Sequence, residues 1–541
     1  MDVRTAGLGE RDAFLDVHRL GPGFFDLRHR FSPASIRDQV VRASMLVDRL
    51  WDDHWIDDHD RDQFVVGAGV AGVSAAIWAA RKGVRVTLVD KNKRAFERQR
   101  VAENRWIDPT LYDWPAHHWW VGKIPFEFAE DQPARDDPLP LRLKKGPANR
   151  AAFGWNQILE QSKQDDTLGR MTTEFDCRFG QLFFQYDREA EDPLAADHAG
   201  EDRGGGVRRP MVVAEWVKKG RAEPSRQRFG AAIRCTGLDD ADGSDEGNSL
   251  CLRGRIVFRG FAFWRPDNYS LENAGIHGEP AWVLISGGGD GALQDLLRLI
   301  NPGPLASSAT LDPTAMYRII HDSGIAKWGE KLRRIQTAED QASRRYIWST
   351  GEVEDRLLLK ELHDTYVEIV DEIQRDAAWQ RIHQEFEARI RFAPHVTFVH
   401  RQAAFGRCYP MNHLLVVVAI RYLETHPRLR RQFTYRPGQQ IATFECTHDG
   451  AHGDAEVCEG KRHRVVFKLV DQDCRDRFRA REDSFNVIII RHGPGRPCGK
   501  QDGASRSRLE SVRQALPYHF ERYGGVLAAR ADQPESRSSS V

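Results

Sequence analysis

The chain lacks both an excess of charge and any long apolar run. Its 79 basic residues (Lys and Arg) balance 79 acidic residues among 541 in total. Proteins that bind nucleic acid or an anionic membrane usually carry a basic surface, and the balance here gives no reason to expect one. The longest apolar run, 414–420, is far shorter than the roughly 20 residues of a membrane helix. We therefore expect a small-molecule ligand, no nucleic acid and no membrane.

Closely spaced cysteine pairs are also missing. The eight cysteines are scattered, and none belongs to a CxxC motif. Such usage indicates reduced, mostly structural thiols, and the N-terminus has no signal-peptide core. We therefore expect a cytoplasmic protein. The group Cys446, His448, His452 and Cys458 has ligand types that suit zinc, but its spacing fits no zinc module. A solvated loop is the better interpretation, so we predict no metal site.

The order of apolar segments and glycine turns predicts an α/β fold with two Rossmann-like domains. The predicted parts are a helical N-terminal extension (1–62), a first Rossmann-type domain with a β-rich part (63–280), a second nucleotide-binding-like domain (281–500) with a helical insertion (303–394), and a C-terminal helix with a disordered tail (501–541). The sequence shows no internal repeat. The helical additions could contact a protein partner.

The segment 63–90 carries the strongest motif of the chain. A strand at 63–67 leads into a GxGxxG turn, a helix of small residues at 71–82 follows, and a second strand runs over 84–90. In this pattern the three glycines allow a tight turn, close approach of the backbone to a pyrophosphate, and close packing of helix on strand. The helix N-terminus then stabilises the phosphates, and an acid at the end of the second strand accepts ribose hydroxyls. The predicted cofactor-binding residues are Gly67, Ala68, Gly69, Ala71, Gly72 and Asp90.

This segment resembles the FAD-binding start of the two-dinucleotide-binding-domain flavoproteins, which include flavin monooxygenases and pyridine-nucleotide reductases. Residues 231–237 are similar to the strand ending in ATG of that group, with Cys235 in place of the usual alanine. A second glycine motif then begins where the NAD(P)H domain of such proteins begins. The resemblance implies FAD as cofactor, and the missing cysteine pair excludes the disulfide-reductase branch.

The second glycine motif follows a strand at 281–285. Its predicted ligand-binding residues are Gly287, Gly289 and Gly291, with Arg401 at the end of the next strand, 396–401. A base at that strand end suits a phosphorylated ribose, which favours NADPH. Asp290 lies in the turn where a pyrophosphate would approach, and its negative charge opposes that approach.

An alternative ligand for the second motif remains open. The run at 286–291 is similar to the glycine loop of spermidine synthases and related adenosyl-binding folds, where an acidic turn suits a cationic ligand. Against this, no acidic strand end follows at the expected distance. A purely structural turn is the third interpretation.

The aromatic stretch 105–120 is the most unusual part of the chain. It directly follows the second strand of the first motif, and its planar rings could pack against a flavin or substrate. The candidate catalytic residues are Trp114, His117 and His118, the histidines as proton relays. The alternative is that these side chains anchor a proline-rich loop on the core.

Together these features predict an FAD-dependent oxidoreductase that uses NAD(P)H, with an unknown small organic molecule or oxygen as acceptor. Two other functions remain open. One is a nucleotide-sensing or regulatory protein that keeps the fold without catalysis. The other is a group-transfer enzyme that holds an adenosyl cofactor at 286–291.

Overall fold

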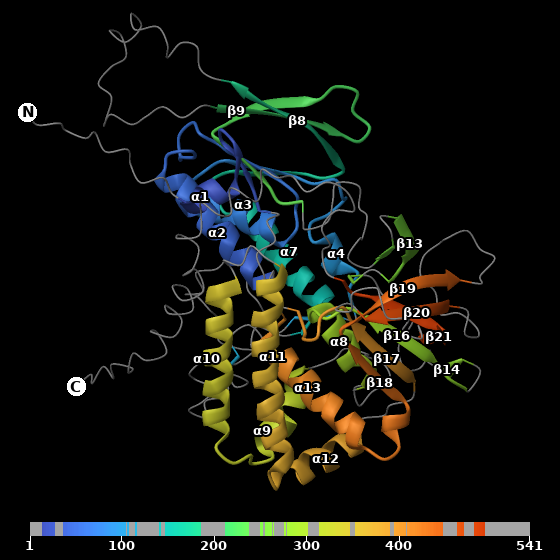
Figure 1. Ribbon diagram of the computed structural model, residues 1–541. Helices are drawn as coiled ribbons and strands as arrows, with labels where there is room; N and C mark the ends of the chain where they lie inside the picture. Colours follow the sequence, from blue (N-terminus) through green and yellow to red (C-terminus); the bar gives the residue numbers. More distant parts are fainter. Residues whose placement is uncertain are drawn as a thin grey trace, which may run out of the picture.

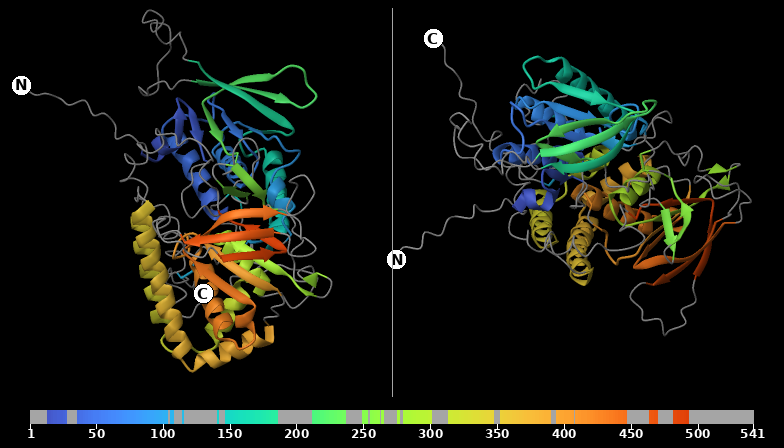
Figure 2. Two further views of the ribbon diagram at one scale, coloured as in Figure 1. Left: turned by 45° about the vertical axis from the view of Figure 1, so that its right-hand side comes forward. Right: turned by 90° about the horizontal axis from the view of Figure 1, so that it is seen from above.

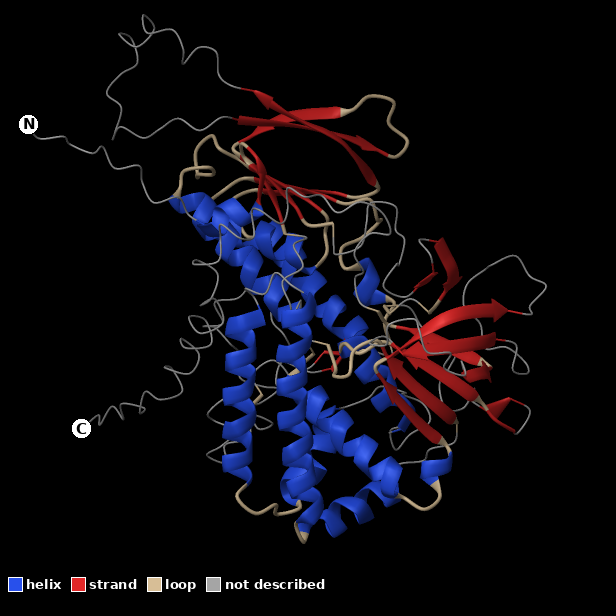
Figure 3. Cartoon of the chain, in the orientation of Figure 1, coloured by secondary structure: helices blue, strands red, loops and turns tan. Residues whose placement is uncertain are grey.

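The chain forms two lobes, each built on a sheet whose central strands are parallel (Figures 1 and 3). The computed structural model describes residues 13–27, 36–103, 105–107, 114–115, 140–141, 146–185, 211–236, 249–252, 255–261, 263–264, 275–276, 279–300, 313–346, 352–389, 394–406, 408–446, 463–469 and 481–492. The first lobe contains the six-stranded sheet β1-β2-β11-β3-β4-β7, and the second contains the four-stranded sheet β18-β17-β16-β22. Figure 2 shows the blue and green first lobe beside the orange and red second lobe.

The centre of the first lobe is built from the predicted strand, turn and helix. Its central elements are β3 (Gln63–Val66), α3 (Val70–Arg81), β4 (Val86–Val89), α7 (Ala148–Gln164) and β7 (Met171–Glu174). A three-stranded antiparallel sheet follows, made of β8 (Cys177–Gln185), β9 (Met211–Lys218) and β10 (Ser225–Phe229), and β11 (Ala231–Arg234) then pairs in parallel with β3. The side chains of β3 and β4 are buried throughout, as expected of inner strands that are covered on both faces.

The N-terminal segment is only partly helical, contrary to the prediction for 1–62. It contains α1 (Ala13–His18), β1 (Arg19–Gly21), β2 (Phe24–Asp26) and α2 (Ile36–Asp52). The short strand β2 pairs in parallel with β11 and so extends the main sheet. Three residues are too few to show the alternation that reveals a strand, so the pairing depends on the partner that β11 offers. The longest helix in this segment is α2.

The second lobe repeats this order of elements. Its sheet and covering helices are β16 (Trp282–Ser286), α8 (Asp290–Ile300), β17 (His395–His400), α13 (Pro410–Thr425), a 3-10 turn η5 (Leu429–Arg431), β18 (Phe433–Pro437) and β22 (Val487–Ile490). An antiparallel sheet of β19 (Gln439–Cys446), β20 (His463–Leu469) and β21 (Arg481–Phe485) precedes β22. In both lobes the strand before the glycine turn is central, the next two strands lie on one side of it, and the strand after the antiparallel sheet lies on the other.

Each parallel sheet is covered by helices on one face and by its antiparallel sheet on the other. In the first lobe, Phe64 and Val66 pack against Trp216 and Phe229 of that antiparallel layer. In the second lobe, Leu284 packs in a cluster with the corresponding layer. Both lobes therefore have three layers. They share the order of strands and the pattern of burial, but their residues differ, which is why the sequence shows no repeat.

Within the described residues, four further helices follow α8 before the chain reaches β17. They are α9 (Pro313–Asp322), α10 (Trp328–Tyr346), α11 (Glu352–Arg375) and α12 (Ala378–Arg389). Helices α10 and α11 pack side by side and extend towards the first lobe (Figure 1). None of the helices in the described ranges is long and apolar enough to cross a membrane.

Short elements connect the lobes and complete the fold. They are α4 (Glu97–Arg100), β5 (Trp106–Ile107), β6 (Gly146–Pro147), β12 (Ser249–Leu252), β13 (Arg255–Arg259), β14 (Gly275–Ile276) and β15 (Glu279–Pro280). The predicted C-terminal helix and tail, 501–541, lie outside the described residues.

Candidate functional site

The first glycine turn is held by contacts that leave no room for larger residues. Gly67 has φ +104°, and a Cβ there would lie 2.5 Å from the carbonyl oxygen of Cys235 on the neighbouring chain segment. A Cβ at Gly72 would lie 1.8 Å from the Gly67 carbonyl oxygen. Only glycine fits at both places, and its lack of a side chain allows α3 to pack closely against the end of the sheet.

Gly69 differs from the other two glycines because it faces open space. A Cβ at this residue would meet no atom within 4 Å. Gly69 is the N-cap of α3, and with Ala71 in the first turn it leaves that end without an acidic side chain. Backbone N–H groups at such an end attract anions. The open space and the exposed helix end fit the pyrophosphate of a dinucleotide.

Asp90 ties the end of β4 to the glycine turn. Its carboxylate accepts hydrogen bonds from the backbone N–H of Ala68 (2.5 Å) and of Asn92 (2.6 Å). The side chain is 9% exposed. Burial raises the pKa of Asp90, although the hydrogen bonds from Asn92 and Ala68 act to lower it. A carboxylate at this strand end can accept hydrogen bonds from ribose hydroxyls.

The second glycine turn repeats the backbone hydrogen bonds of the first. In the first turn the bonds are Gly67 N–H to Val89 O (2.7 Å), Phe96 N–H to Ala68 O (2.9 Å) and Cys235 N–H to Val66 O (2.7 Å). The corresponding bonds of the second turn are Gly287 N–H to Val399 O (2.9 Å), Gly406 N–H to Gly288 O (2.7 Å) and Arg491 N–H to Ser286 O (2.7 Å). Gly287 also has positive φ, +147°, and a Cβ there would lie 2.0 Å from the Arg491 carbonyl oxygen. These bonds make Gly287 and Gly289 the counterparts of Gly67 and Gly69.

Two side chains distinguish the second turn. The first is Asp290, which takes the place of Val70 at the start of the helix. Its carboxylate accepts hydrogen bonds from the Tyr409 N–H and the Asn412 amide, both at 2.9 Å. It is therefore bonded to the start of α13. Burial raises the pKa of Asp290 to about 7, against the lowering effect of these two bonds. Gly291 follows, and a Cβ there would lie 3.3 Å from the Arg491 side chain.

The second is His400, which takes the place of Asp90 at the strand end. His400 is 3% exposed, and its Nε2 lies 2.9 Å from the Tyr435 hydroxyl. Burial, and then the nearby His363, lower the pKa of His400 to about 3, so the ring is neutral. The predicted ligand residue Arg401 follows it with an exposed side chain. This strand end thus presents a neutral ring and a guanidinium where the first presents a carboxylate.

Trp114 lies in the core of the second lobe. It is 1% exposed and packs edge to face on Tyr317 of α9, with ring centroids 5.7 Å apart. This placement favours the anchoring interpretation, because a fully buried ring inside a helical core is not presented to a flavin or substrate. His117 and His118 lie outside the described residues.

A buried ion cluster between the lobes has no counterpart among the residues predicted from the sequence. Asp295 of α8 pairs with Arg105 (2.5 Å), Arg491 (2.7 Å) and Arg298 (3.0 Å). Burial alone would raise the pKa of Asp295, but the three guanidinium groups hold it well below its usual range. Arg105 also stacks on Phe263, 3.9 Å from its ring centroid. The signal in the sequence is an acid among the leucines of the stretch 292–300.

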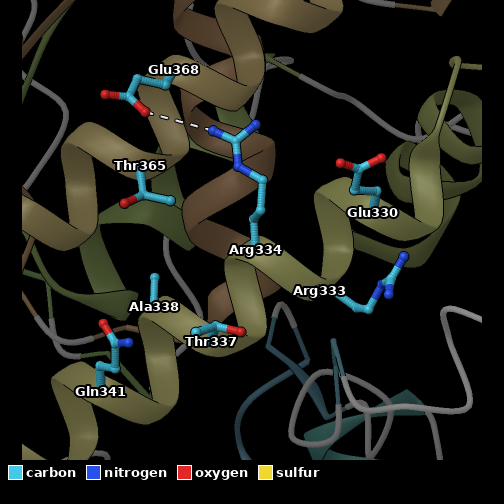
Figure 4. Close-up of a pocket in the computed structure, with 8 residues that line it drawn as sticks. All are labelled: Glu330, Arg333, Arg334, Thr337, Ala338, Gln341, Thr365 and Glu368. Carbon is cyan, nitrogen blue, oxygen red and sulfur yellow. Dashed lines mark ion pairs between the residues drawn. The ribbon is translucent and has the colours of Figure 1, made fainter.

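A surface groove of about 520 Å³, drawn in Figure 4, lies on the hairpin of α10 and α11, and no residue of either glycine turn lines it. Its lining comes from α10 and α11 and consists of Glu330, Arg333, Arg334, Thr337, Ala338, Gln341, Thr365 and Glu368. An ion pair of 3.6 Å joins Arg334 to Glu368 across it. The mixture of charges indicates a solvated helical surface.

The cysteines agree only in part with the expectation of reduced thiols. Cys177, Cys235 and Cys408 are buried and are not disulfide-bonded. Cys251 of β12 is disulfide-bonded, so the expectation is wrong there. Within the ranges that the structure describes, no group of three or more His, Cys, Asp or Glu residues could hold a metal ion. The loop 447–462, with His448, His452 and Cys458, lies outside them.

Comparison with known proteins identifies the first lobe. Residues 62–241 match the family model "FAD dependent oxidoreductase". The chain thus carries a domain of this family and is an FAD-dependent oxidoreductase. This confirms the flavoprotein resemblance of 63–90, and FAD is the cofactor. No curated protein matches the sequence.

Solved flavoprotein structures are similar to the chain only distantly. The bacillithiol disulfide reductase of Staphylococcus aureus has 9% identity and a TM-score of 0.37, with coverage of 80% of this chain and 76% of that one. The thioredoxin reductase of Lactococcus lactis has 10% identity and a TM-score of 0.31, covering 85% and 100%. The ornithine hydroxylase of Pseudomonas aeruginosa has 9% identity and a TM-score of 0.33, covering 85% and 99%. Similarity this low carries no information about activity or substrate.

Proposed function

We propose that the protein takes a hydride from NAD(P)H bound at the second glycine turn and passes electrons through FAD to a small organic acceptor or oxygen. The observation that carries this proposal is the repeated geometry of the two turns. Both have a central parallel strand, a glycine with positive φ and the same backbone hydrogen bonds to the loop after the next strand. A family whose first turn holds FAD needs an electron donor, and a second dinucleotide turn supplies a place for one.

In the first lobe, Gly67, Ala68, Gly69, Ala71, Gly72 and Asp90 would hold FAD. The open space at Gly69 receives the pyrophosphate, and the α3 N-terminus stabilises its charge. Asp90 positions the turn through its hydrogen bond from the Ala68 N–H and would accept hydrogen bonds from the ribose hydroxyls. When bound, FAD supplies the redox chemistry, while these residues bind and orient it.

In the second lobe, the nucleotide we favour is NADPH. Asp90 in the first turn would repel a 2′-phosphate, whereas its counterpart His400 is a neutral ring. Arg401, exposed beside it, can pair with the phosphate. Gly287, Gly289 and Gly291 would admit the pyrophosphate. An adenosyl ligand is less favoured, because Asp290 is bonded to α13.

An anaerobic spectrum of the FAD-loaded protein tests the proposal. We expect flavin absorption bands that bleach on addition of NADPH, and more slowly with NADH. Arg401→Ala should weaken NADPH binding about tenfold or more, since a charge-assisted contact to phosphate is worth roughly 1.5–3 kcal/mol. The matched control is Arg431→Ala, an exposed arginine of η5.

The outcomes separate the alternatives. Flavin bands that neither nucleotide bleaches would overturn the use of NAD(P)H and favour the sensing role or another donor. Equal effects of the Arg401 and Arg431 variants would overturn the choice of NADPH. Cytoplasmic localisation and a protein partner on the added helices stay predictions. The Cys251 disulfide is unusual for the cytoplasm.

A further inference from the structure

Asp290 gives the second glycine turn a property that the first turn lacks. It is the first residue of α8, directly after the glycines that would face a pyrophosphate. The corresponding residue of α3 is Val70, which carries no charge. An ionised carboxylate at this helix end would repel the phosphates, since two like charges within several ångströms in a partly buried site oppose each other by about a kcal/mol or more.

The surroundings of the Asp290 carboxylate allow it to become neutral. Its hydrogen bonds come from two uncharged groups, the Tyr409 N–H and the Asn412 amide. Burial raises its pKa to about 7, and no described arginine or lysine is among the causes of the change. Asp295, one turn further along α8, is the opposite case, because three guanidinium groups surround it and hold its pKa low.

Among the residues that the structure describes, the charged and titratable groups on neighbouring elements do not supply a counter-charge. They are Cys408 and His413 at the start of α13, His400 and Arg401 after β17, Arg491 after β22, Asp295 on α8, and His363 on α11. Burial lowers the pKa of each of the three histidines, so they are neutral near pH 7. The Arg491 guanidinium is bound to Asp295, and Arg401 extends into solvent.

We propose that binding of a pyridine nucleotide at the second glycine turn takes up one proton from solvent, onto the Asp290 carboxylate. This inference rests on the function proposed above. The proton removes the charge that opposes the pyrophosphate, and the neutral carboxyl still accepts the hydrogen bonds of Tyr409 and Asn412 that hold the start of α13. The protein therefore binds the nucleotide more tightly in mildly acidic solution than in alkaline solution.

The sign of the effect follows from proton linkage. Suppose that a group must be protonated in the complex. At a pH where this group is already protonated in the free protein, the affinity does not depend on pH; at a pH where the group is ionised, the affinity falls as the pH rises. We expect near-constant affinity below about pH 6.5. Above about pH 7.5 we expect a loss approaching tenfold for each pH unit.

Calorimetric titration of the FAD-loaded protein with NADP⁺ and with NAD⁺ tests this. Oxidised nucleotides avoid turnover, and NAD⁺ lacks the 2′-phosphate, whose own ionisation near pH 6 would add a second effect. Titrations near pH 8 in two buffers of different ionisation enthalpy give the number of protons taken up. We expect close to one proton for both nucleotides with the wild-type protein, and close to none with Asp290→Asn.

Each result decides the proposal. A wild-type protein that takes up no proton, or an Asp290→Asn variant with the same loss of affinity at high pH, would overturn the role of Asp290 and leave the nucleotide site intact. If neither nucleotide binds at any pH, the proposed function fails, and this inference with it. The wild-type proton count needs no variant, so it decides the question even where Asp290→Asn folds poorly. Asp364→Asn, an exposed acid of α11, is the matched control.

Discussion

The first glycine turn begins its helix with Val70 and ends its second strand at Asp90, whereas the second turn begins with Asp290 and ends at His400. The backbones of the two turns make the same hydrogen bonds. Their charges are reversed: the acid lies at the strand end in the first turn and at the helix start in the second. The two turns therefore share one backbone geometry and differ in the charges that their side chains present.

The lobes differ also in how their helices meet the sheet. Gly72 lies so close to the Gly67 carbonyl oxygen that a Cβ would reach within 1.8 Å. The corresponding residue of α8 is Ala292, which is fully buried and has a Cβ. Helix α3 therefore requires glycine at this position, whereas α8 does not. This difference gives the most severe test of the comparison.

Gly72→Ala should have the largest effect of any single substitution in the two turns. The methyl group cannot fit unless α3 moves away from β3, so we expect loss of bound FAD together with loss of native structure. Flavin content and circular dichroism measure the two. The reverse change, Ala292→Gly, should cost only about 1–2 kcal/mol, from helix propensity and a lost methyl group. A Gly72→Ala protein with full flavin content would show that the close contact is not needed.

The next largest effect is expected at the ion cluster that joins the lobes. Asp295→Asn leaves the guanidinium groups of Arg105, Arg491 and Arg298 without their shared carboxylate in a buried place. Removing one partner of a buried ion pair costs about 3–5 kcal/mol. Denaturant unfolding measures this loss. Asp364→Asn breaks an exposed pair with Lys360 and should change the stability by at most about 0.5 kcal/mol. Equal effects of the two changes would contradict a structural role for the cluster.

Acid should distinguish the lobes. His363, His400 and His413 all belong to the second lobe, and burial lowers the pKa of each. A histidine whose pKa is lower in the folded state is stabilising above its unfolded pKa of about 6.5, and this contribution is lost as the pH falls. We expect each of these histidines to cost the second lobe about 2–3 kcal/mol between pH 6.5 and pH 4, because a tenfold change in proton affinity corresponds to about 1.4 kcal/mol.

Hydrogen exchange resolves this loss by lobe. Amides of α11 and α13 should lose protection at a higher pH than those of α3. His413→Gln should reduce the difference, and His59→Gln, at a site 84% exposed, should leave it unchanged. Simultaneous loss of protection in both lobes would mean that they unfold as one unit and that the histidines do not set the order.

The central elements were predictable because their signals are local. The strands around both glycine turns and helix α3 lie within two residues of the predicted ranges. Apolar runs next to glycine turns are a direct sign of buried strands. The pairing of β2 with β11 was not predictable. A three-residue strand carries no periodicity, and its partner lies about 200 residues away.

The site was predictable only in part, for the same reason. The glycines and Asp90 could be assigned because motif and strand end lie in one short segment. The sequence predicts only that the Asp290 carboxylate faces an approaching pyrophosphate. Its hydrogen bond from Asn412 joins residues 122 positions apart in the chain, so no local pattern indicates it. The Arg105–Asp295 pair spans 190 positions, and no pattern in one segment reveals such a partner.

The smallest effect, at Gly69, tests the site without disturbing the fold. A methyl group there meets no protein atom within 4 Å, so Gly69→Ala should leave the melting temperature of the FAD-free protein unchanged. The same methyl occupies the space assigned to the FAD pyrophosphate, and we expect about tenfold weaker FAD binding, or about 1.4 kcal/mol. Fluorescence titration of the FAD-free protein measures it. Gly154→Ala, at an open position in α7, is the control and should bind FAD like the wild type. Unchanged FAD affinity in Gly69→Ala would mean that the pyrophosphate does not approach this glycine, and the similarity of the two turns would then be one of backbone alone.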